Sequence, residues 1–118
     1  MILVVDDDPV VRSMLLEVLC RAGHFTAAVA NGKAALDLLD QGVRPDVILL
    51  DLVMPIMDGR TTLEQLRHRG SLVPVLLVSA FLDDIGANFG SPVVGGLPKP
   101  FGHEALIEAV ERALDPGP

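Results

Sequence analysis

Val47-Ile48-Leu49-Leu50-Asp51 is an unbroken apolar run that ends in a carboxylate. Such a run is typical of a strand that is buried on both faces of a parallel sheet. In an open α/β sheet, ligands bind in the crevice beyond the carboxyl ends of the strands. The sequence therefore predicts that Asp51 stands at the end of a central strand, beside a ligand site.

A second stretch has the same form, because Ile2-Leu3-Val4-Val5 leads directly into Asp6-Asp7-Asp8. Parallel neighbouring strands would bring all these carboxylates to one end of the sheet. Crowded carboxylates repel one another unless a cation or shared protons intervene, and oxygen ligands favour a hard cation such as Mg²⁺. The residues thus predict a Mg²⁺-dependent phosphoryl site with Asp51 as the nucleophile.

Hydrophobic periodicity predicts strands alternating with helices along the whole chain. Five strands interleaved with five helices predict right-handed crossovers and a doubly wound five-stranded parallel sheet. The segment 83–90 is expected to be a weak helix at best, because Gly86 and Gly90 interrupt it. The expected strands are 2–6, 25–29, 46–50, 73–78 and 93–97, and the other helices begin at Asp8-Pro9, at Asn31, after Asp58-Gly59 and before Leu106.

The apolar positions of each helix predict the face that it buries. Asp8, Asn31 and Asp58 are expected to act as N-caps, because short polar side chains accept hydrogen bonds from the first turn. The side chains expected to point inward are Val11, Leu15, Val18, Leu19 and Ala22 in the first helix, Ala35, Leu38 and Leu39 in the second, Leu63 and Leu66 in the third, and Leu106, Ile107, Val110 and Leu114 in the last.

Composition limits the class of protein. With 118 residues, half of them hydrophobic, we expect a single domain over residues 1–118. A net charge of −7 and a pI near 4.7 argue against nucleic acid as a direct partner. No apolar stretch is long enough to span a membrane. The single cysteine and the lack of a signal peptide before the first strand predict a reducing cytoplasm.

Two further signals stand beyond strand ends. Ser79 follows the fourth predicted strand, and Lys99-Pro100-Phe101 follows the fifth. A phosphoryl group on Asp51 would present three oxygens that need a cation, a hydroxyl and a positive side chain. Mg²⁺, Ser79 and Lys99 could supply one each.

Taken together, these motifs resemble the receiver domain of two-component response regulators. The acidic pair Asp6-Asp7, the segment Asp51 to Gly59, the hydroxyl of Ser79 and the triplet Lys99-Pro100-Phe101 occur in the family's order, and the resemblance runs from Ile2 to about Leu114. It implies a flavodoxin-like (βα)5 fold with strand order 2-1-3-4-5. It also implies a regulatory phosphoacceptor, with no output domain in this chain, rather than an enzyme.

The resemblance also implies roles for the site residues. Asp51 would accept a phosphoryl group from a histidine kinase or phosphotransfer protein. Asp7, Asp51 and the backbone carbonyl of Val53 would bind Mg²⁺ directly, and Asp6 would act mainly through a metal-bound water. Lys99 would pair with Asp51 and then with its phosphate. The peptide bond between Lys99 and Pro100 is cis in similar proteins.

Other positions bear on signalling by resemblance. Ser79 would turn inward to meet the phosphoryl oxygen, whereas Gly96 occupies the position where similar proteins carry Tyr or Phe. The short interval from Ser79 to Lys99 is similar to that of receivers attached to hybrid sensor kinases. Val53 and Phe81 flank the expected path of the hydrolytic water, and because neither side chain orients water we expect slow autodephosphorylation. Kinase choice would depend on surfaces that include Arg12, Ser13, Glu17, Phe101 and Gly102.

Two alternatives come from other classes. An aspartyl-phosphate phosphatase also uses an Asp at the end of a strand, but such enzymes carry a second acid two positions later, where this chain has Val53. A phosphate-independent, receiver-like interaction module would be expected to lose the acidic residues or Lys99. All of these are present, while Gly96 is the one departure that favours the module.

Overall fold

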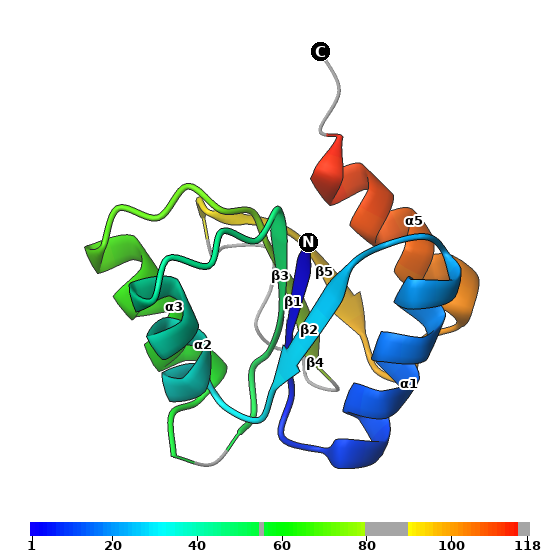
Figure 1. Ribbon diagram of the computed structural model, residues 1–118, viewed down its shortest axis with the longest axis horizontal. Helices are drawn as coiled ribbons and strands as arrows, with labels where there is room; N and C mark the ends of the chain where they lie inside the picture. Colours follow the sequence, from blue (N-terminus) through cyan, green and yellow to red (C-terminus); the bar gives the residue numbers. More distant parts are fainter. Residues whose placement is uncertain (55, 80–89, 116–118) are drawn as a thin grey trace.

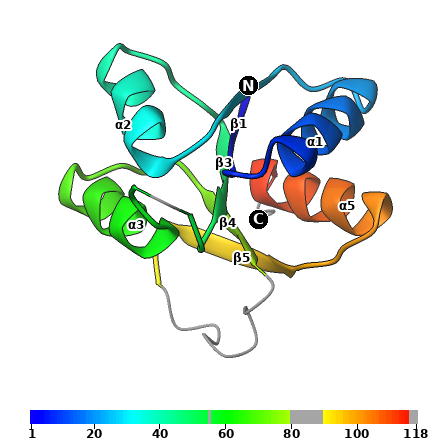
Figure 2. The same ribbon diagram turned by 90° about the horizontal axis from the view of Figure 1, so that it is seen from below.

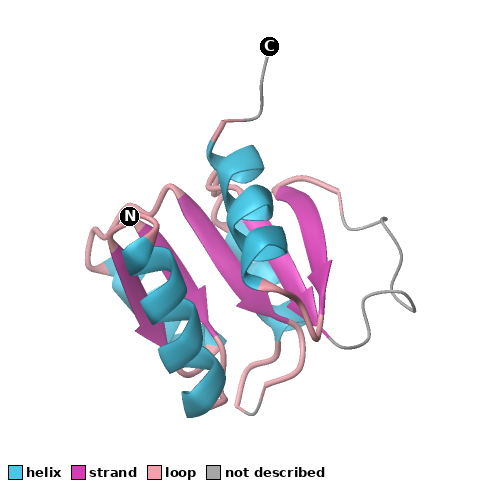
Figure 3. Ribbon diagram, turned by 90° about the vertical axis from the view of Figure 1, so that its right-hand side faces the viewer, coloured by secondary structure: helices cyan, strands magenta, loops and turns pink. Residues whose placement is uncertain are grey.

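A five-stranded parallel sheet runs through the middle of the protein (Figure 1). The computed structural model describes residues 1–54, 56–79 and 90–115. The strand order is β2-β1-β3-β4-β5 and every neighbouring pair is parallel, so the arrows in Figure 3 point toward one end of the molecule. The predicted flavodoxin-like, doubly wound fold is therefore confirmed.

Each predicted strand is present, and no strand end differs from its predicted position by more than two residues. Asp51 and Ser79 are themselves the last residues of their strands. The fourth strand begins after Pro74, which has no N–H to donate to a neighbour, although its carbonyl accepts a hydrogen bond from Ile48. The strands are β1 (Ile2–Val5), β2 (Thr26–Val29), β3 (Val47–Asp51), β4 (Val75–Ser79) and β5 (Val93–Pro98).

Four helices among the described residues cover the sheet, two on each face (Figure 2). The chain's crossovers place the first and last helices on one face and the second and third on the other. The predicted weak helix at 83–90 falls almost entirely within 80–89, which lies outside the described residues. The helices are α1 (Pro9–Arg21), α2 (Gly32–Asp40), α3 (Gly59–His68) and α5 (His103–Leu114).

Two apolar clusters form the core, one on each face of the sheet. Side chains alternate between the faces, so that Ile2 and Val4 pack with α1 and α5, while Leu3 and Val5 pack with α2 and α3. Because both faces are covered, β1, β3 and β4 are buried along their whole length. This burial explains why the central strands are unbroken apolar runs.

The three predicted N-caps are confirmed. The side chains of Asp8, Asn31 and Asp58 accept hydrogen bonds from backbone N–H groups in the first turns of α1, α2 and α3. The hydrogen bond that the Thr61 N–H donates to Asp58 Oδ1 lowers the pKa of Asp58, because it stabilises the charged form of that carboxyl. These caps fix where each of the three helices begins, close to the carboxyl end of the sheet.

The predicted inward faces are largely confirmed. In α2, Ala35 is buried, and Leu38 and Leu39 are partly buried and pack against the core. Gly32 and Leu36 are further buried residues of this helix, and Gly32 lies where α2 approaches Thr62 of α3 closely. Ala22 is exposed because α1 ends one residue before it.

No helix among the described residues combines the length and the apolar character that a bilayer crossing requires.

Candidate functional site

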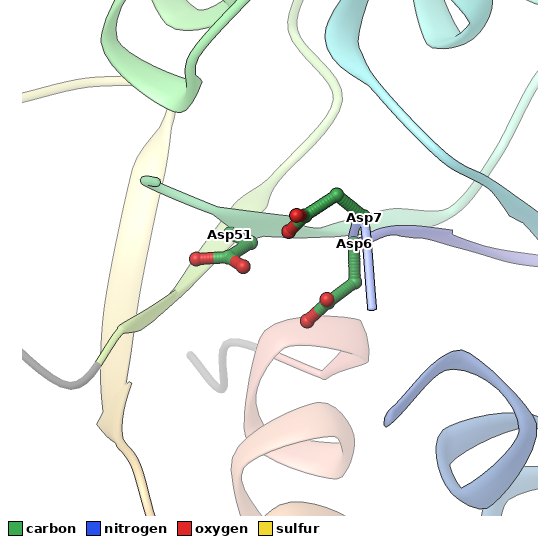
Figure 4. A group of neighbouring side chains, drawn as sticks. All are labelled: Asp6, Asp7 and Asp51. Carbon is green, nitrogen blue, oxygen red and sulfur yellow. The ribbon is translucent and has the colours of Figure 1, made fainter. Parts of the chain in front are cut away.

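Three carboxylates meet at the carboxyl end of the sheet (Figure 4). Asp6, Asp7 and Asp51 each offer an oxygen, and these oxygens all lie within 4.8 Å of one another. Asp6 and Asp51 are buried, with exposed fractions of 2% and 6%, whereas Asp7 is exposed. The site is therefore a half-enclosed acidic cluster that is open to solvent on the Asp7 side.

The register of the sheet brings these residues together. β1 and β3 are parallel neighbours in which Val5 pairs with Leu50, so Asp6 and Asp51 are the next residues on adjacent strands. The Asp6 N–H donates to the carbonyl of Val29 at 3.2 Å, which continues the β1 and β2 pairing up to the site. Two strands that end at the same level thus place two acidic side chains side by side.

Lys99 reaches the cluster from the end of β5. Its Nζ lies 3.0 Å from Asp6 Oδ2 and 3.2 Å from Asp51 Oδ2, and its backbone N–H donates to the carbonyl of Ser79 at 3.0 Å. The ion pair with Asp51 that the resemblance implied is present, and so is the cis bond to Pro100. The pair with Asp6 is an additional contact.

The pKa values of Lys99 and Asp51 are both raised. Burial alone would lower the pKa of Lys99, but the hydrogen bond to Asp6 and the charges of Asp51 and Asp6 outweigh it. For Asp51, burial raises the pKa, and the hydrogen bond from the Val53 N–H and the charge of Lys99 only partly oppose it. Asp51 is therefore a carboxylate whose charge is only partly compensated, as expected of a group that becomes neutralised by a ligand.

The loop after β3 supplies a direct contact to Asp51. The Val53 N–H donates to Asp51 Oδ1 at 3.1 Å, while the Val53 side chain is exposed. Val53 therefore contacts Asp51 through its backbone amide, and this hydrogen bond orients the Asp51 carboxylate. Phe81, which was expected to flank the site on the other side, lies outside the described residues.

Gly59 is a site residue whose importance sequence reasoning underestimated, since the Asp58-Gly59 pair was interpreted mainly as a helix start. A Cβ at Gly59 would stand 2.4 Å from the Asp51 carbonyl oxygen and 2.6 Å from Leu52 Cα. The Gly59 N–H also donates to the Leu52 carbonyl at 3.0 Å. Only glycine allows α3 to begin this close to the end of β3.

Ser79 ends its strand instead of following it, and Arg12 contacts the backbone of the site. Ser79 is the last residue of β4 and is 1% exposed. β4 pairs with β3, so Ser79 stands at the same end of the sheet as Asp51. Arg12 was expected on an exposed face of α1, but its Nη1 donates to the backbone carbonyls of Asp6 and Asp7 at 2.8 and 3.1 Å. No local sequence pattern distinguishes this contact from an exposed arginine, because it depends on how α1 folds back on the loop.

The donor set fits a hard divalent cation. Three carboxylates converge and Lys99 balances one of their negative charges, which leaves a charge that a divalent cation would compensate. All the donors are oxygens, as Mg²⁺ prefers, and the described part of the cluster contains no sulfur or imidazole ligand.

The fold and the cluster together define a class of protein. A parallel sheet of order 2-1-3-4-5 carries an acidic cluster, a lysine and a buried serine at its carboxyl end, which is where flavodoxin-like domains bind their ligands. The family model for the response regulator receiver domain matches residues 2–111. The chain belongs to this family, the receiver domains of two-component response regulators.

Curated relatives agree with this assignment. The response regulator MprA of Mycolicibacterium vanbaalenii is 37% identical over 116 residues, which cover 96% of this chain and 49% of that protein. The DNA-binding transcriptional regulator NtrC of Escherichia coli is 36% identical over 113 residues, which cover 94% of this chain and 24% of that protein. The chain thus spans half or less of the length of these two relatives.

Solved structures include both kinds of receiver that the sequence suggested. The chemotaxis protein CheY4 of Vibrio cholerae has a TM-score of 0.85 and 30% identity, covering 96% of this chain and 97% of that one. The receiver domain of the hybrid histidine kinase CckA has a TM-score of 0.82 and 30% identity, covering 97% and 98%. Receivers of separate regulators and of hybrid kinases therefore share this fold.

Proposed function

We propose that this domain is a phosphoacceptor, which takes a phosphoryl group onto Asp51 from a histidine kinase or a histidine phosphotransfer protein. The observation that carries the proposal is the position of Asp51, a buried carboxylate at a strand end, held by Lys99 and the Val53 amide and facing Asp6 and Asp7. A nucleophile needs this combination of a fixed orientation and a charge that its neighbours only partly compensate.

In the proposed reaction a carboxylate oxygen of Asp51 attacks the phosphorus of a phosphohistidine. A new O–P bond forms, the P–N bond breaks, and the imidazole leaves with the electron pair and takes up a proton. Because the phosphoryl group adds negative charge to an acidic site, the reaction requires a cation, and Mg²⁺ held by Asp7, Asp51 and the Val53 carbonyl would supply that charge stabilisation, with Asp6 acting mainly through a metal-bound water.

Lys99 and Ser79 complete the proposed site. Lys99 already donates to Asp51 Oδ2, so its ammonium group is placed to interact with the negative charge of a phosphoryl group on Asp51. Ser79 ends β4, and its carbonyl accepts the Lys99 backbone N–H, so a movement of the Ser79 backbone as its hydroxyl turns toward the phosphoryl group would also act on the β5 end. We propose that this movement changes the surface that a partner recognises.

The proposal is regulatory rather than enzymatic. The position that would carry the second acid of an aspartyl-phosphate phosphatase holds Val53, whose side chain is 59% exposed and offers no proton donor or acceptor. The phosphate-independent interaction module is disfavoured because Asp6, Asp7 and Lys99 are present and directed at Asp51.

Acetyl phosphate with Mg²⁺, followed by intact mass measurement, tests the proposal. The wild-type protein should gain one phosphoryl group, and Asp51→Asn should gain none. Asp8→Asn is the matched control, because Asp8 is the neighbouring acid that caps α1 and asparagine keeps the cap. Equal uptake by the Asp51→Asn variant would contradict the assignment, continuous turnover of acetyl phosphate would support the phosphatase, and no uptake by the wild-type protein would support the interaction module.

A further inference from the structure

Arg12 makes contacts that neither the sequence pattern nor the family assignment predicted. One guanidinium nitrogen, Nη1, donates to the backbone carbonyls of Asp6 and Asp7, at 2.8 and 3.1 Å. These carbonyls belong to the two consecutive residues whose side chains form half of the acidic cluster. α1 begins directly beyond the end of β1, so its first turns lie against this loop (Figure 1).

The two acidic residues differ in how the rest of the protein holds them. Asp6 is fixed on every side, because its N–H donates to the carbonyl of Val29, its Oδ1 accepts from the Asp8 N–H at 2.9 Å, and its Oδ2 accepts from Lys99. Asp7 is exposed, and its carbonyl accepts a hydrogen bond from Arg12, which lies in α1 and not in the loop that holds Asp7. The direction of the Asp7 side chain therefore depends on Arg12 more than that of Asp6 does.

We propose that Arg12 is a positioning residue for the metal, which fixes the Asp6-Asp7 backbone so that the Asp7 carboxylate faces Asp51. This inference rests on the proposed Mg²⁺-dependent function and adds a residue to it. It gives Arg12 a role within the site besides the expected one in kinase recognition, since at least one of its nitrogens is directed at the chain's own backbone.

Two physical effects of Arg12 on Mg²⁺ affinity have opposite signs. The positive guanidinium repels a cation, so its removal by itself would tighten Mg²⁺ binding, and salt would screen that effect. Loss of the two hydrogen bonds would let the loop move, so its removal would weaken Mg²⁺ binding, and salt would not abolish that effect. Groups that orient metal ligands change metal affinity by about tenfold or more when they are removed, so we expect positioning to dominate.

Titration of Mg²⁺ into the metal-free protein, followed by calorimetry at low and high ionic strength, separates these effects. Arg12→Met should weaken Mg²⁺ binding by about tenfold at both ionic strengths. Arg21→Met is the matched control, because Arg21 is an exposed arginine of the same helix whose ion pair is with Glu17. Arg21→Met should leave Mg²⁺ affinity unchanged within about twofold, since an exposed charge at that distance is screened.

A second measurement distinguishes positioning from partner recognition and from a general loss of structure. The rate of phosphorylation by acetyl phosphate is measured against Mg²⁺ concentration, so that no partner protein takes part. Arg12→Met should need about tenfold more Mg²⁺ for half of its maximal rate and should reach a plateau near that of the wild-type protein. Arg12→Lys, which keeps the charge but not the planar guanidinium, should lie between the two.

The outcomes are separable. If the wild-type protein does not bind Mg²⁺, the proposed function itself fails. If the wild-type protein binds Mg²⁺ and Arg12→Met binds it equally or more tightly, positioning by Arg12 is refuted while the proposed function stands. A lowered plateau with an unchanged Mg²⁺ midpoint would also refute it, as would loss of helical circular dichroism in Arg12→Met together with wild-type Mg²⁺ affinity in Arg12→Lys.

Discussion

At the scale of single residues, Asp51 combines a nucleophilic position with an unfavourable environment. Its carboxylate is buried beside Asp6, and burial raises its pKa above the ordinary value of 3.8 despite the hydrogen bond from Val53 and the charge of Lys99. Functional groups are often kept in such environments at a cost in stability. The proposed reaction thus needs a charged carboxylate at Asp51, whereas burial in the fold disfavours the charged form.

This conflict predicts the pH dependence of Asp51→Asn in the metal-free protein. Between pH 3.8 and the raised pKa, the folded protein holds a proton at Asp51 more firmly than the unfolded chain, so wild-type stability falls as the pH rises through that window. Asparagine does not ionise and keeps an acceptor for the Val53 N–H. The Asn variant should therefore be more stable than the wild-type protein near neutral pH, and the difference should vanish below pH 3.8.

Urea unfolding in the presence of a chelator, followed by circular dichroism because the chain has no Trp or Tyr, measures the difference. Asp37→Asn serves as the control for the exchange of a carboxylate for an amide, since Asp37 is an exposed residue of α2 that lies outside the acidic cluster. A less stable Asp51→Asn variant near neutral pH would mean that the Lys99 ion pair outweighs burial.

At the scale of the elements, α2 and α3 approach each other too closely for any side chain at Gly32. A Cβ at Gly32 would stand 1.8 Å from Thr62 Oγ1 and 3.0 Å from Thr62 Cβ. Thr62 is 1% exposed and its hydroxyl donates to the Asp58 carbonyl at 2.8 Å, so it has little room to move. The close approach of Gly32 to Thr62 links the start of α2 to the first turn of α3. α3 begins at the end of the loop that follows Asp51.

Gly32→Ala should therefore destabilise the protein, by about 1 to 3 kcal/mol, as overpacking of a core does. Gly32 is the first residue of α2, where alanine gains less than the about 1 kcal/mol of helix propensity that it brings in a helix interior, so the clash dominates. In a Thr62→Ala background, where the nearest atom is gone, the same change should cost at least about 1 kcal/mol less.

A double-mutant cycle measured by urea unfolding gives this coupling, and Lys33→Ala at the next, exposed position of α2 controls for the substitution to alanine. Equal costs of Gly32→Ala in both backgrounds would show that the two helices separate freely and that Thr62 does not limit their approach.

At the scale of the whole molecule, the cluster joins distant parts of the chain. Asp6 and Lys99 are 93 positions apart, and Lys99 and Asp51 are 48 apart, yet both pairs are in contact. Together the two contacts require that β1, β3 and β5 are in register at their carboxyl ends. A ligand that binds here therefore favours the complete fold over any partly folded state.

Mg²⁺ should accordingly stabilise the entire domain. At a Mg²⁺ concentration about tenfold above its Kd, binding to the folded state should add about 1.4 kcal/mol to the free energy of unfolding. The gain should shift the Tm upward by several degrees, and Asp7→Asn should largely abolish it, because that variant lacks one of the three carboxylates.

Thermal unfolding with increasing Mg²⁺ tests this prediction, with Asp37→Asn again as the exposed-carboxylate control that should keep the full shift. An equal rise in Tm for the Asp7→Asn variant would show that the ion acts by general screening and not at the cluster.

The sequence alone determined the order of the elements and the acids at their ends. Apolar runs predict buried strands because both faces of a parallel sheet exclude water, and Asp8, Asn31 and Asp58 predict helix starts because capping is a contact within a few residues. The motifs around Asp51 and Lys99 predicted the family for the same reason, since their spacing along the chain is itself the signal.

Only the tertiary structure decided which groups touch across elements. The close approach of α2 to Thr62 at Gly32 follows from helix packing, the second partner of Lys99 follows from sheet register, and the target of Arg12 follows from the path of the loop before α1. Each of these contacts joins groups that several local patterns would allow. The choice among them is made by packing and by the need to pair buried polar groups, and those energies exist only once the chain has folded.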